Sequence, residues 1–315
     1  MSPTQALHSP IFLTYLVLVA GVLAYAGIAI AFFQWVLHKP MGSVWLTYKG
    51  WLIMVPIVTA AVLLGRWAVI VGAALLSIFG FKEFARATGL YRDWWMTAAV
   101  YLAIVALAAA SAINDPFTGH PGWFGLYMAM PVFAINLLVI IPVIRNQPKG
   151  QLQGIALSIL GFIYIGWMFG HLGFLANSNN PYGYLLFLVL ATELNDVAAF
   201  TFGKLFGRQP LRSNISPRKT WGGAIGAAAF SMAVPWALRF SFPHFSTRQL
   251  LLTGLIVGVG GQLGDLSISV IKRDIGVKDM GGSIPGHGGI LDRIDSLIFV
   301  APLFAHMVHY FNGLR

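Results

Sequence analysis

The chain has 315 residues, of which 57% are hydrophobic and only 10% are charged, and its mean hydropathy is +0.76. Uncharged apolar runs of 15 to 27 residues recur along it, which indicates a multispanning helical membrane protein and excludes an ordinary soluble domain. Because the chain has no cysteine, disulfides, thiolate metal sites and cysteine redox chemistry are also excluded.

Hydropathy and turn residues predict an all-α fold of about ten transmembrane helices, with nine as the alternative because the second and third spans are short. The predicted spans are 10–36, 51–65, 67–81, 94–113, 123–144, 152–176, 183–203, 222–240, 249–271 and 289–311. The first run is too long for the core of a signal peptide and no Lys or Arg precedes it, so we expect a retained helix. Residues 183–315 carry the segments rich in charge and glycine, and these segments have no counterpart in residues 1–182. We nevertheless expect the two parts to form one integrated membrane domain.

Lys and Arg fall unevenly on the alternate loops of this ten-span pattern. One set of loops holds fifteen of them: Lys39, Lys49, Lys82, Arg86, Arg92, Arg145, Lys149, Lys204, Arg208, Arg212, Arg218, Lys219, Lys272, Arg273 and Lys278. The other set holds four, which are Arg66, Arg239, Arg248 and Arg315. Since positive residues accumulate on the cytoplasmic side, both termini are predicted on the non-cytoplasmic side. Topology and contact with anionic lipid account for the net charge of +10, so nucleic-acid binding is not expected.

Five of the ten acidic residues fall inside predicted spans, where a charge is costly. They are Glu193, Asp196, Asp265, Asp292 and Asp295. The direction of each span places all five near the cytoplasmic ends of their helices, at a similar depth. Pairs three residues apart share a helix face, as in Glu193 with Asp196 and Asp292 with Asp295.

Carboxylates gathered at one depth repel one another unless cations hold them, and hard oxygen ligands suit Mg²⁺. We therefore predict a divalent-metal site with Asp265 and Asp292 as ligands and with Asp196 and Asp295 as weaker candidates. The alternative is that each acid is neutralised by a neighbour such as Arg293, or is protonated inside the bundle.

Two basic segments, 204–221 and 272–288, border the spans that carry these acids. The sequence PGHGG at 285–289 has no side chain beyond His287, so a phosphate could approach backbone N–H groups at the start of the last span. Basic and hydroxyl side chains nearby could clamp several phosphate groups: Ser216, Arg218, Lys219, Thr220, Lys272, Arg273 and Lys278. This combination predicts a polyphosphate site.

The segment from Ser269 to Asp295 resembles the signature of phosphatidate cytidylyltransferases, also called CDP-diacylglycerol synthases. The matching residues are Ser269, Lys272, Arg273, Lys278, Asp279, Pro285, His287, Gly288, Gly289, Asp292, Arg293 and Asp295. Upstream, the resemblance extends through NDVAAFTFGKLFG and ISPRKTWGG, and so covers the chain from about residue 183. The chain departs from the family at Gly222, where an acidic or amide residue is usual.

The resemblance implies transfer of a cytidylyl group from CTP to phosphatidic acid, giving CDP-diacylglycerol and pyrophosphate in phospholipid biosynthesis. It implies Mg²⁺ as cofactor, with room for a second cation, and a homodimer. We expect the active site on the cytoplasmic face, where the carboxylates and basic loops are predicted, and we expect a bacterial plasma membrane because the chain has no long polar N-terminal extension. The residues expected to act in catalysis are Asp265, Asp292, Lys272, Arg273 and Lys278. Those expected to bind substrate are Ser216, Lys219, Thr220, Ser269, Asp279, His287, Gly288, Gly289 and Arg293.

Two other classes of function remain open from the sequence. A cation-coupled transporter also places carboxylates beside glycine-rich helices, although such sites usually lie near the midplane of two repeats. A noncatalytic membrane scaffold would not need the signature. The GxxxG spacings at Gly254 and Gly258, and at Gly260 and Gly264, are expected to serve helix packing, and His171 is expected to be structural.

Overall fold

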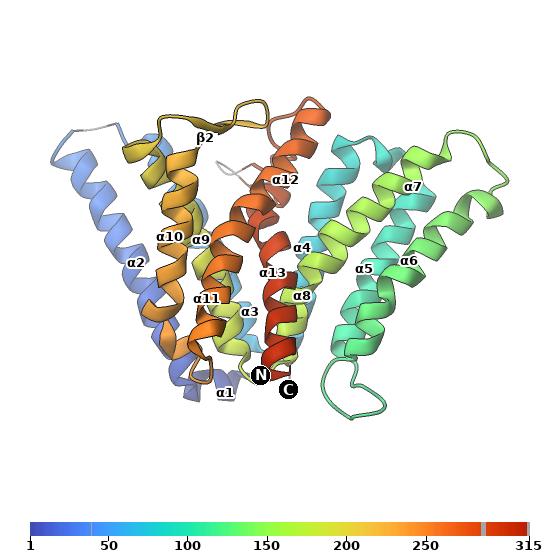
Figure 1. Ribbon diagram of the computed structural model, residues 1–315, viewed down its shortest axis with the longest axis horizontal. Coiled ribbons are helices and arrows are strands. Elements are labelled where there is room, and N and C mark those ends of the chain that lie inside the picture. Colours follow the sequence, from blue (N-terminus) through green and yellow to red (C-terminus); the bar gives the residue numbers. More distant parts are fainter. Residues whose placement is uncertain (39, 285–287, 314–315) are drawn as a thin grey trace.

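The structure is a computed structural model that describes residues 1–38, 40–284 and 288–313. Its helices run up and down through a bundle that fans out toward the end carrying a small β-hairpin (Figure 1). The N-terminal part comprises α1 (Pro3–His8), α2 (Pro10–Trp35), α3 (Gly42–Leu64), α4 (Arg66–Ala87), η1 (Leu90–Arg92), α5 (Trp94–Ala112), α6 (Phe124–Ile144), α7 (Gln151–Leu160), η2 (Gly161–Met168), α8 (Phe169–Phe174) and η3 (Leu175–Asn177). The C-terminal part comprises α9 (Pro181–Phe206), β1 (Pro210–Arg212), β2 (Ser216–Thr220), α10 (Trp221–Ala237), η4 (Arg239–Ser241), α11 (Thr247–Leu255), η5 (Ile256–Gly260), α12 (Gly261–Asp274) and α13 (Leu291–Asn312).

The all-α membrane fold predicted from hydropathy is confirmed. Within the described residues, nine helical stretches are long and apolar enough to cross a membrane, and α7 to η3 and α11 to α12 each count as one. The remaining predicted span corresponds to α10, which has 17 residues. Helix α1 and the end of α13 lie at the same end of the bundle (Figure 1), so the chain traverses it an even number of times. Helix α10 therefore supplies the tenth traverse.

The second and third spans are longer than their apolar runs suggested. Helix α3 begins at Gly42 rather than near residue 51, and α4 continues to Ala87 rather than ending near residue 81. Both predicted boundaries followed the nearest charged residues. Helical hydrogen bonding continues past the charges, because charged side chains near a helix end can reach the headgroup region.

Polar caps at several helix starts explain where the chain re-enters the bundle. The Ser9 hydroxyl accepts a hydrogen bond from the backbone N–H of Phe12 before Pro10 opens α2. At the start of α11, Ser246 and Gln249 form a reciprocal capping box. These side chains accept hydrogen bonds from the first backbone N–H groups of each helix, which have no carbonyl partner within the helix.

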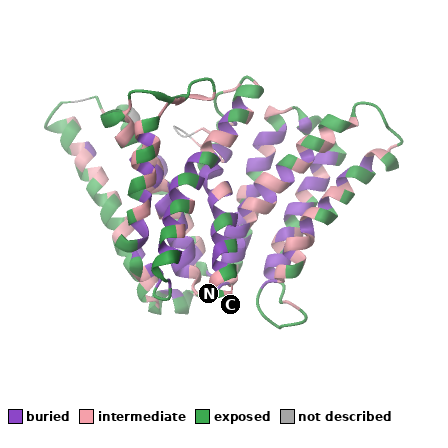
Figure 2. Cartoon of the chain, in the orientation of Figure 1, coloured by how far each residue is buried: buried purple, intermediate pink, exposed green. Residues whose placement is uncertain are grey.

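Helix α13 is the central element of the bundle. About 67% of its most apolar window is buried, against 6% for α2, and Figure 2 shows buried residues along most of its length. It packs on α4 and α8 from the N-terminal part and on α9 and α12 from the C-terminal part. The start of α13 is therefore fixed by helices from both parts of the chain.

The GxxxG glycines pack helices closely, as the sequence predicted. A Cβ at Gly254 would stand 2.7 Å from the Cα of Met232 on α10, and one at Gly264 would stand 2.6 Å from the carbonyl oxygen of Asp295 on α13. Between these glycines the helix widens into the π-helical turn η5. Helix α11 and the η5 turn thus lie against α10, whereas α12 lies against α13 beside Asp265.

Candidate active site

A polar cavity with about 140 Å³ of space for water lies between α9, α12 and α13. Six carboxylates and two basic side chains line it: Glu193, Asp196, Asp265, Asp279, Asp292, Asp295, Lys272 and Arg293. The structure therefore brings together all five acids that the sequence placed at one depth. It adds Asp279, from the segment between α12 and α13. Negative groups outnumber positive ones in the lining, so the cavity favours a bound cation.

One face of α12 carries three polar side chains at helical spacing, Asp265, Ser269 and Lys272. Asp265 accepts a hydrogen bond of 3.2 Å from the Ser269 hydroxyl and forms an ion pair with Lys219 from β2. About a quarter of each side chain in that ion pair is exposed. Asp265 thus stands at the rim of the cavity, where its ion pair is open to solvent.

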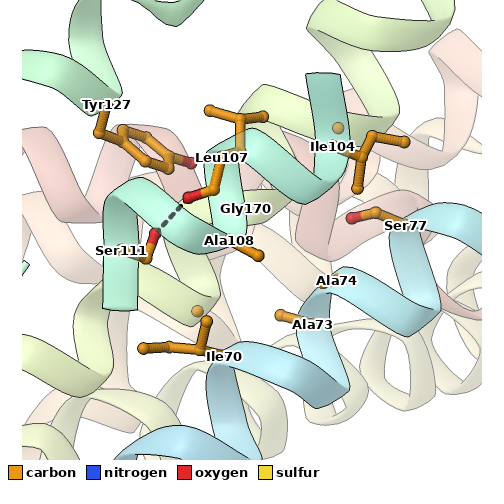
Figure 3. A pocket seen from close by; sticks show the side chains of 12 residues that line it. Ile70, Ala73, Ala74, Ser77, Ile104, Leu107, Ala108, Ser111, Tyr127 and Gly170 are labelled. Atoms are coloured by element: carbon orange, nitrogen blue, oxygen red, sulfur yellow. Dashed lines mark hydrogen bonds between the residues drawn. The ribbon is translucent and has the colours of Figure 1, made fainter. Parts of the chain in front are cut away.

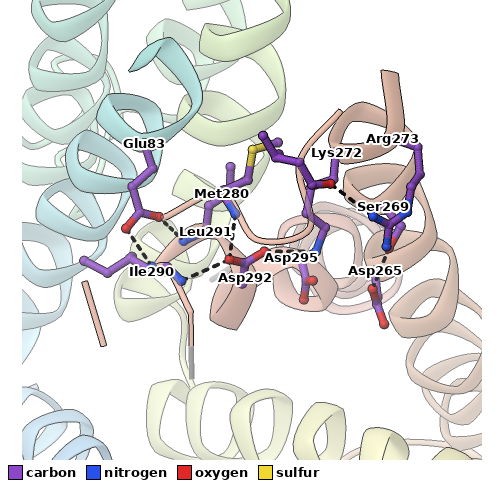
Figure 4. A network of polar contacts seen from close by, with 12 residues as sticks. Glu83, Asp265, Ser269, Lys272, Arg273, Met280, Ile290, Leu291, Asp292 and Asp295 are labelled. Carbon is purple, nitrogen blue, oxygen red and sulfur yellow. Dashed lines mark hydrogen bonds and ion pairs between the residues drawn. The ribbon is translucent and has the colours of Figure 1, made fainter. Parts of the chain in front are cut away.

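Asp292, in the first turn of α13, is held much more firmly (Figure 4). Its Oδ1 pairs with Lys272 Nζ at 2.9 Å, and its Oδ2 accepts 3.0 Å hydrogen bonds from the backbone N–H groups of Met280 and Gly289. The Asp292 and Lys272 side chains are only 5% and 10% exposed. This carboxylate both lines the cavity and organises the segment that precedes its helix.

The β-hairpin covers the rim of the site on the side of Asp265. Its strands pair antiparallel, with Pro210 opposite Thr220 and Arg212 opposite Ser216. Arg273, on α12, donates 3.1 Å hydrogen bonds to the carbonyl oxygens of Ile215 and Val277. These contacts tie the hairpin to the end of α12 and hold Lys219 beside the cavity.

Several predicted site residues are not among the described residues that line the cavity. The Thr220 hydroxyl caps α10 by accepting a hydrogen bond of 3.2 Å from the backbone N–H of Gly223. Lys278 is exposed, and Ser216 is half-buried in β2. Gly288 has φ +80°, and a Cβ there would stand 3.0 Å from Asp292 Oδ2. His287 lies outside the described residues.

Sequence reasoning missed Glu83, which was assigned to a loop because the third span was ended at residue 81. In the structure Glu83 lies on α4, is 8% exposed, and contacts the segment that leads into α13 (Figure 4). The apolar residues Phe81 and Phe84 on either side of it are buried. Continued helical periodicity through these residues was the signal that could have placed Glu83 inside the bundle.

The donors in this cavity fit a hard divalent cation by their chemistry, because they are carboxylate oxygens, with neither thiolate nor imidazole among the described lining residues. In the described part of the chain, no three Asp, Glu or His side chains stand in the arrangement of a metal site. Lysines hold the two carboxylates predicted as ligands, Asp265 and Asp292. Binding of an ion would require these lysines to move.

A second, much smaller cavity of about 20 Å³ lies between α4, α5 and the η2 and α8 turns (Figure 3). Its lining is mostly small and apolar, including Ala73, Ala108 and Gly170, with hydroxyls from Ser77, Ser111 and Tyr127. That volume holds little more than one water molecule. The cavity is too small and too apolar to compete with the acidic cavity as a substrate site.

Together, the fold and the site define a polytopic membrane protein with an acidic cavity beside a basic hairpin, an arrangement suited to phosphate groups and a hard cation. Comparison with known proteins agrees with this class. A family model described as "Cytidylyltransferase family" matches residues 45–311, which is most of the chain. The chain belongs to this family of nucleotidyltransferases, as the signature predicted.

Curated relatives are similar over much of their length. "Uncharacterized protein YnbB" of Escherichia coli (strain K12) is 32% identical over 274 residues, covering 85% of this chain and 88% of that protein. "Phosphatidate cytidylyltransferase" of Staphylococcus aureus (strain COL) is 35% identical over 200 residues, covering 62% and 76%. The protein of the same name from Staphylococcus haemolyticus (strain JCSC1435) is 36% identical over 183 residues, covering 58% and 69%.

Proposed function

We propose that the chain transfers a cytidylyl group from CTP to phosphatidic acid, releasing pyrophosphate and forming CDP-diacylglycerol. The observation that carries this proposal is the acidic cavity flanked by Lys219, Lys272 and Arg293, in a chain of the cytidylyltransferase family. Relatives named phosphatidate cytidylyltransferase support the choice of lipid substrate. Family membership favours this enzyme over a cation-coupled transporter.

The proposed reaction needs no strong base, because a phosphate monoester has a second pKa of about 6 and is already anionic at neutral pH. An oxygen of the lipid phosphate attacks the α-phosphorus of CTP, and the bond from that phosphorus to the oxygen that bridges the α- and β-phosphates breaks, so that this oxygen leaves with pyrophosphate. The obstacle is repulsion between two anions. Basic side chains directed at the phosphates lower it, and bound Mg²⁺ would supply further charge neutralisation.

We further propose that Lys219 and Lys272 exchange partners when substrate binds. Each lysine now neutralises one of the two carboxylates that we propose as metal ligands. Transfer of the lysines to phosphate oxygens would free Asp265 and Asp292 for the cation, with Asp196 and Asp295 nearby. Ser269 and Arg293 are then positioned at the cavity to orient the nucleotide.

The proposed location is the cytoplasmic leaflet of a bacterial plasma membrane. CTP is cytosolic and the phosphate of phosphatidic acid lies at the headgroup plane, so the cavity must open where the two meet. Most Lys and Arg residues belong to the predicted loops at this end of the bundle. A homodimer is part of the same proposal and stems from the family resemblance.

The direct test uses purified full-length protein in detergent with labelled CTP, Mg²⁺ and phosphatidic acid. We expect a lipid-linked CMP product and an equal amount of pyrophosphate, and we expect a chelator to abolish both and added Mg²⁺ to restore them. A folded protein that makes no lipid-linked CMP under these conditions would rule out the proposed reaction. Product that is unaffected by the chelator would rule out the metal assignment.

A further inference from the structure

Glu83 is a buried carboxylate that belongs to α4 but acts on the start of α13 (Figure 4). Its Oε1 accepts hydrogen bonds from the Ser283 hydroxyl at 2.6 Å and from the backbone N–H of Ile290 at 3.0 Å. Its Oε2 accepts one from the backbone N–H of Leu291 at 2.9 Å. Among the described residues, the hydrogen-bond partners of this carboxylate all lie in the segment that precedes Asp292, about 200 residues further along the chain.

Helix α13 has no capping side chain of its own, since its N-cap residue is Ile290. The first N–H groups of a helix have no partner within the helix, and their positive potential favours an anion. Glu83 supplies that anion from another helix. A buried carboxylate is costly unless hydrogen bonds compensate it, so these three donors both stabilise Glu83 and are fixed by it.

The glycines of this segment pack directly on the same carboxylate. A Cβ at Gly281 would stand 2.6 Å from Glu83 Oε1, and a Cβ at Gly289 would stand 2.8 Å from Glu83 Cδ. On its other side, the segment donates the backbone N–H groups of Met280 and Gly289 to Asp292. The described parts of the connection from α12 to α13, before residue 285 and after residue 287, thus contact two carboxylates, Asp292 in the cavity lining and Glu83 on α4.

We propose that Glu83 is a positioning residue of the active site, which orients Asp292 by fixing the start of α13. Glu83 is not among the described residues that line the cavity. It acts by making the preceding segment a rigid support for Asp292. This inference rests on the proposed cytidylyl transfer for its effect on catalysis, but its effect on the segment can be measured separately.

The absence of cysteine in the chain allows a clean reporter of that segment. Gly282 is exposed, and a Cβ there would meet nothing within 4 Å, so Gly282→Cys can carry a nitroxide spin label with little disturbance. The test compares Glu83→Gln with the parent Gly282→Cys protein, as full-length chain in detergent. The glutamine side chain would keep the shape of the glutamate but place an amide NH₂ against backbone donors.

Asp93→Asn provides a matched control in the same background. Asp93 is also a partly buried carboxylate near the hairpin end of the bundle, where it accepts a hydrogen bond from the N–H of Met96 at the start of α5 and pairs with Arg145 at 2.8 Å. It therefore combines a helix cap with an ion pair, but it is absent from the cavity lining. General loss of stability should affect both variants, whereas loss of positioning should affect only Glu83→Gln.

We expect the nitroxide spectrum to sharpen in Glu83→Gln and to stay unchanged in Asp93→Asn. We also expect Glu83→Gln to lower kcat at least tenfold and to raise the Mg²⁺ concentration for half-maximal activity at least fivefold. An unchanged spectrum in Glu83→Gln, or equal sharpening in both variants, would overturn the positioning role. If the parent protein makes no lipid-linked CMP, the proposed function fails, while the spectra still decide whether Glu83 fixes the segment.

Discussion

Asp265 and Asp292 carry the same chemical group, but the protein holds them differently. Asp265 has two side-chain partners, Lys219 and Ser269, at the rim of the cavity, whereas Asp292 is bound by Lys272 and by two backbone N–H groups. An Asn at either position would lose the negative charge proposed to hold the metal. Only the change at Asp292 would also leave a buried lysine and a loop without their anion.

We therefore predict that Asp265→Asn loses activity by at least a hundredfold while its stability changes by about 1 kcal/mol or less, because the ion pair is partly exposed. Asp292→Asn should lose at least as much activity and also about 3 kcal/mol of stability. Product formation from labelled CTP and thermal unfolding in detergent measure the two effects. A stable Asp265→Asn protein with normal turnover would contradict the metal assignment.

Lys219 and Lys272 also differ in how much of the protein's stability depends on each of them. In Lys219→Ala, Asp265 keeps the Ser269 hydrogen bond and access to water, so we predict a KM for CTP raised about tenfold and little change in unfolding temperature. In Lys272→Ala, Asp292 becomes a buried charge without its counter-ion, so both turnover and unfolding temperature should fall. Equal losses of stability in the two variants would contradict the prediction that the ion pair of Asp292 with Lys272 is more deeply buried than that of Asp265 with Lys219.

Much of the site could be predicted at the residue scale, because a carboxylate in an apolar span stands out from its surroundings. Glu193, Asp265 and Asp295 were found in this way, and the structure places them around one cavity. The ion pair of Lys219 with Asp265 could not be predicted, since it depends on how the hairpin folds over α12. Glu83 was missed because a charged neighbour, Lys82, marked a false end of its helix.

At the scale of elements, the close packing of α12 on α13 fixes the distance across the cavity. Gly264 lies at this contact, next to Asp265. A methyl group at Gly264 would stand 2.6 Å from the carbonyl oxygen of Asp295 and 2.9 Å from the Cα of Ser296. Both are backbone atoms, so the helices themselves would have to separate.

We predict that Gly264→Ala lowers turnover at least tenfold, because small misplacements of reacting groups are costly and overpacking costs about 1–3 kcal/mol. Gly72→Ala on α4 is the matched control, since a Cβ there meets nothing within 4 Å. That control should keep full turnover and gain up to about 1 kcal/mol of stability from its better helix propensity. Equal turnover in the two variants would show that the spacing of α12 and α13 does not limit catalysis.

Sequence pattern predicted the elements well where apolar runs end in turns and less well where helices continue through charges. Helix α6 runs from Phe124 to Ile144, within one residue of its predicted start and at its predicted end. Helix α3 instead continues past Lys49 toward Gly42, which a hydropathy threshold cannot follow. The hairpin in the SPRKT segment was not predicted either, because short strands on a polar surface have no hydrophobic periodicity.

In the whole molecule, the even number of traverses places α1 and the end of α13 at the end of the bundle opposite the hairpin (Figure 1). The acidic cavity lies beside the hairpin, because Lys219 of β2 pairs with Asp265 of the cavity lining. The asymmetry of Lys and Arg predicts that the hairpin end faces the cytoplasm. That orientation is required if cytosolic CTP is the substrate. It can be tested without any assay of activity, because the chain has no cysteine to compete with an introduced one.

We predict opposite accessibility for single cysteines at Ser213 and Thr118. Both residues are exposed, the first in the hairpin and the second in the loop between α5 and α6 at the other end of the bundle (Figure 1). In spheroplasts, a membrane-impermeant maleimide should label Thr118→Cys at once and Ser213→Cys only after lysis. Equal labelling of both in lysed membranes is the control for reactivity. Labelling of Ser213→Cys in intact spheroplasts would place the cavity away from cytosolic CTP and would remove the physical basis of the proposed reaction.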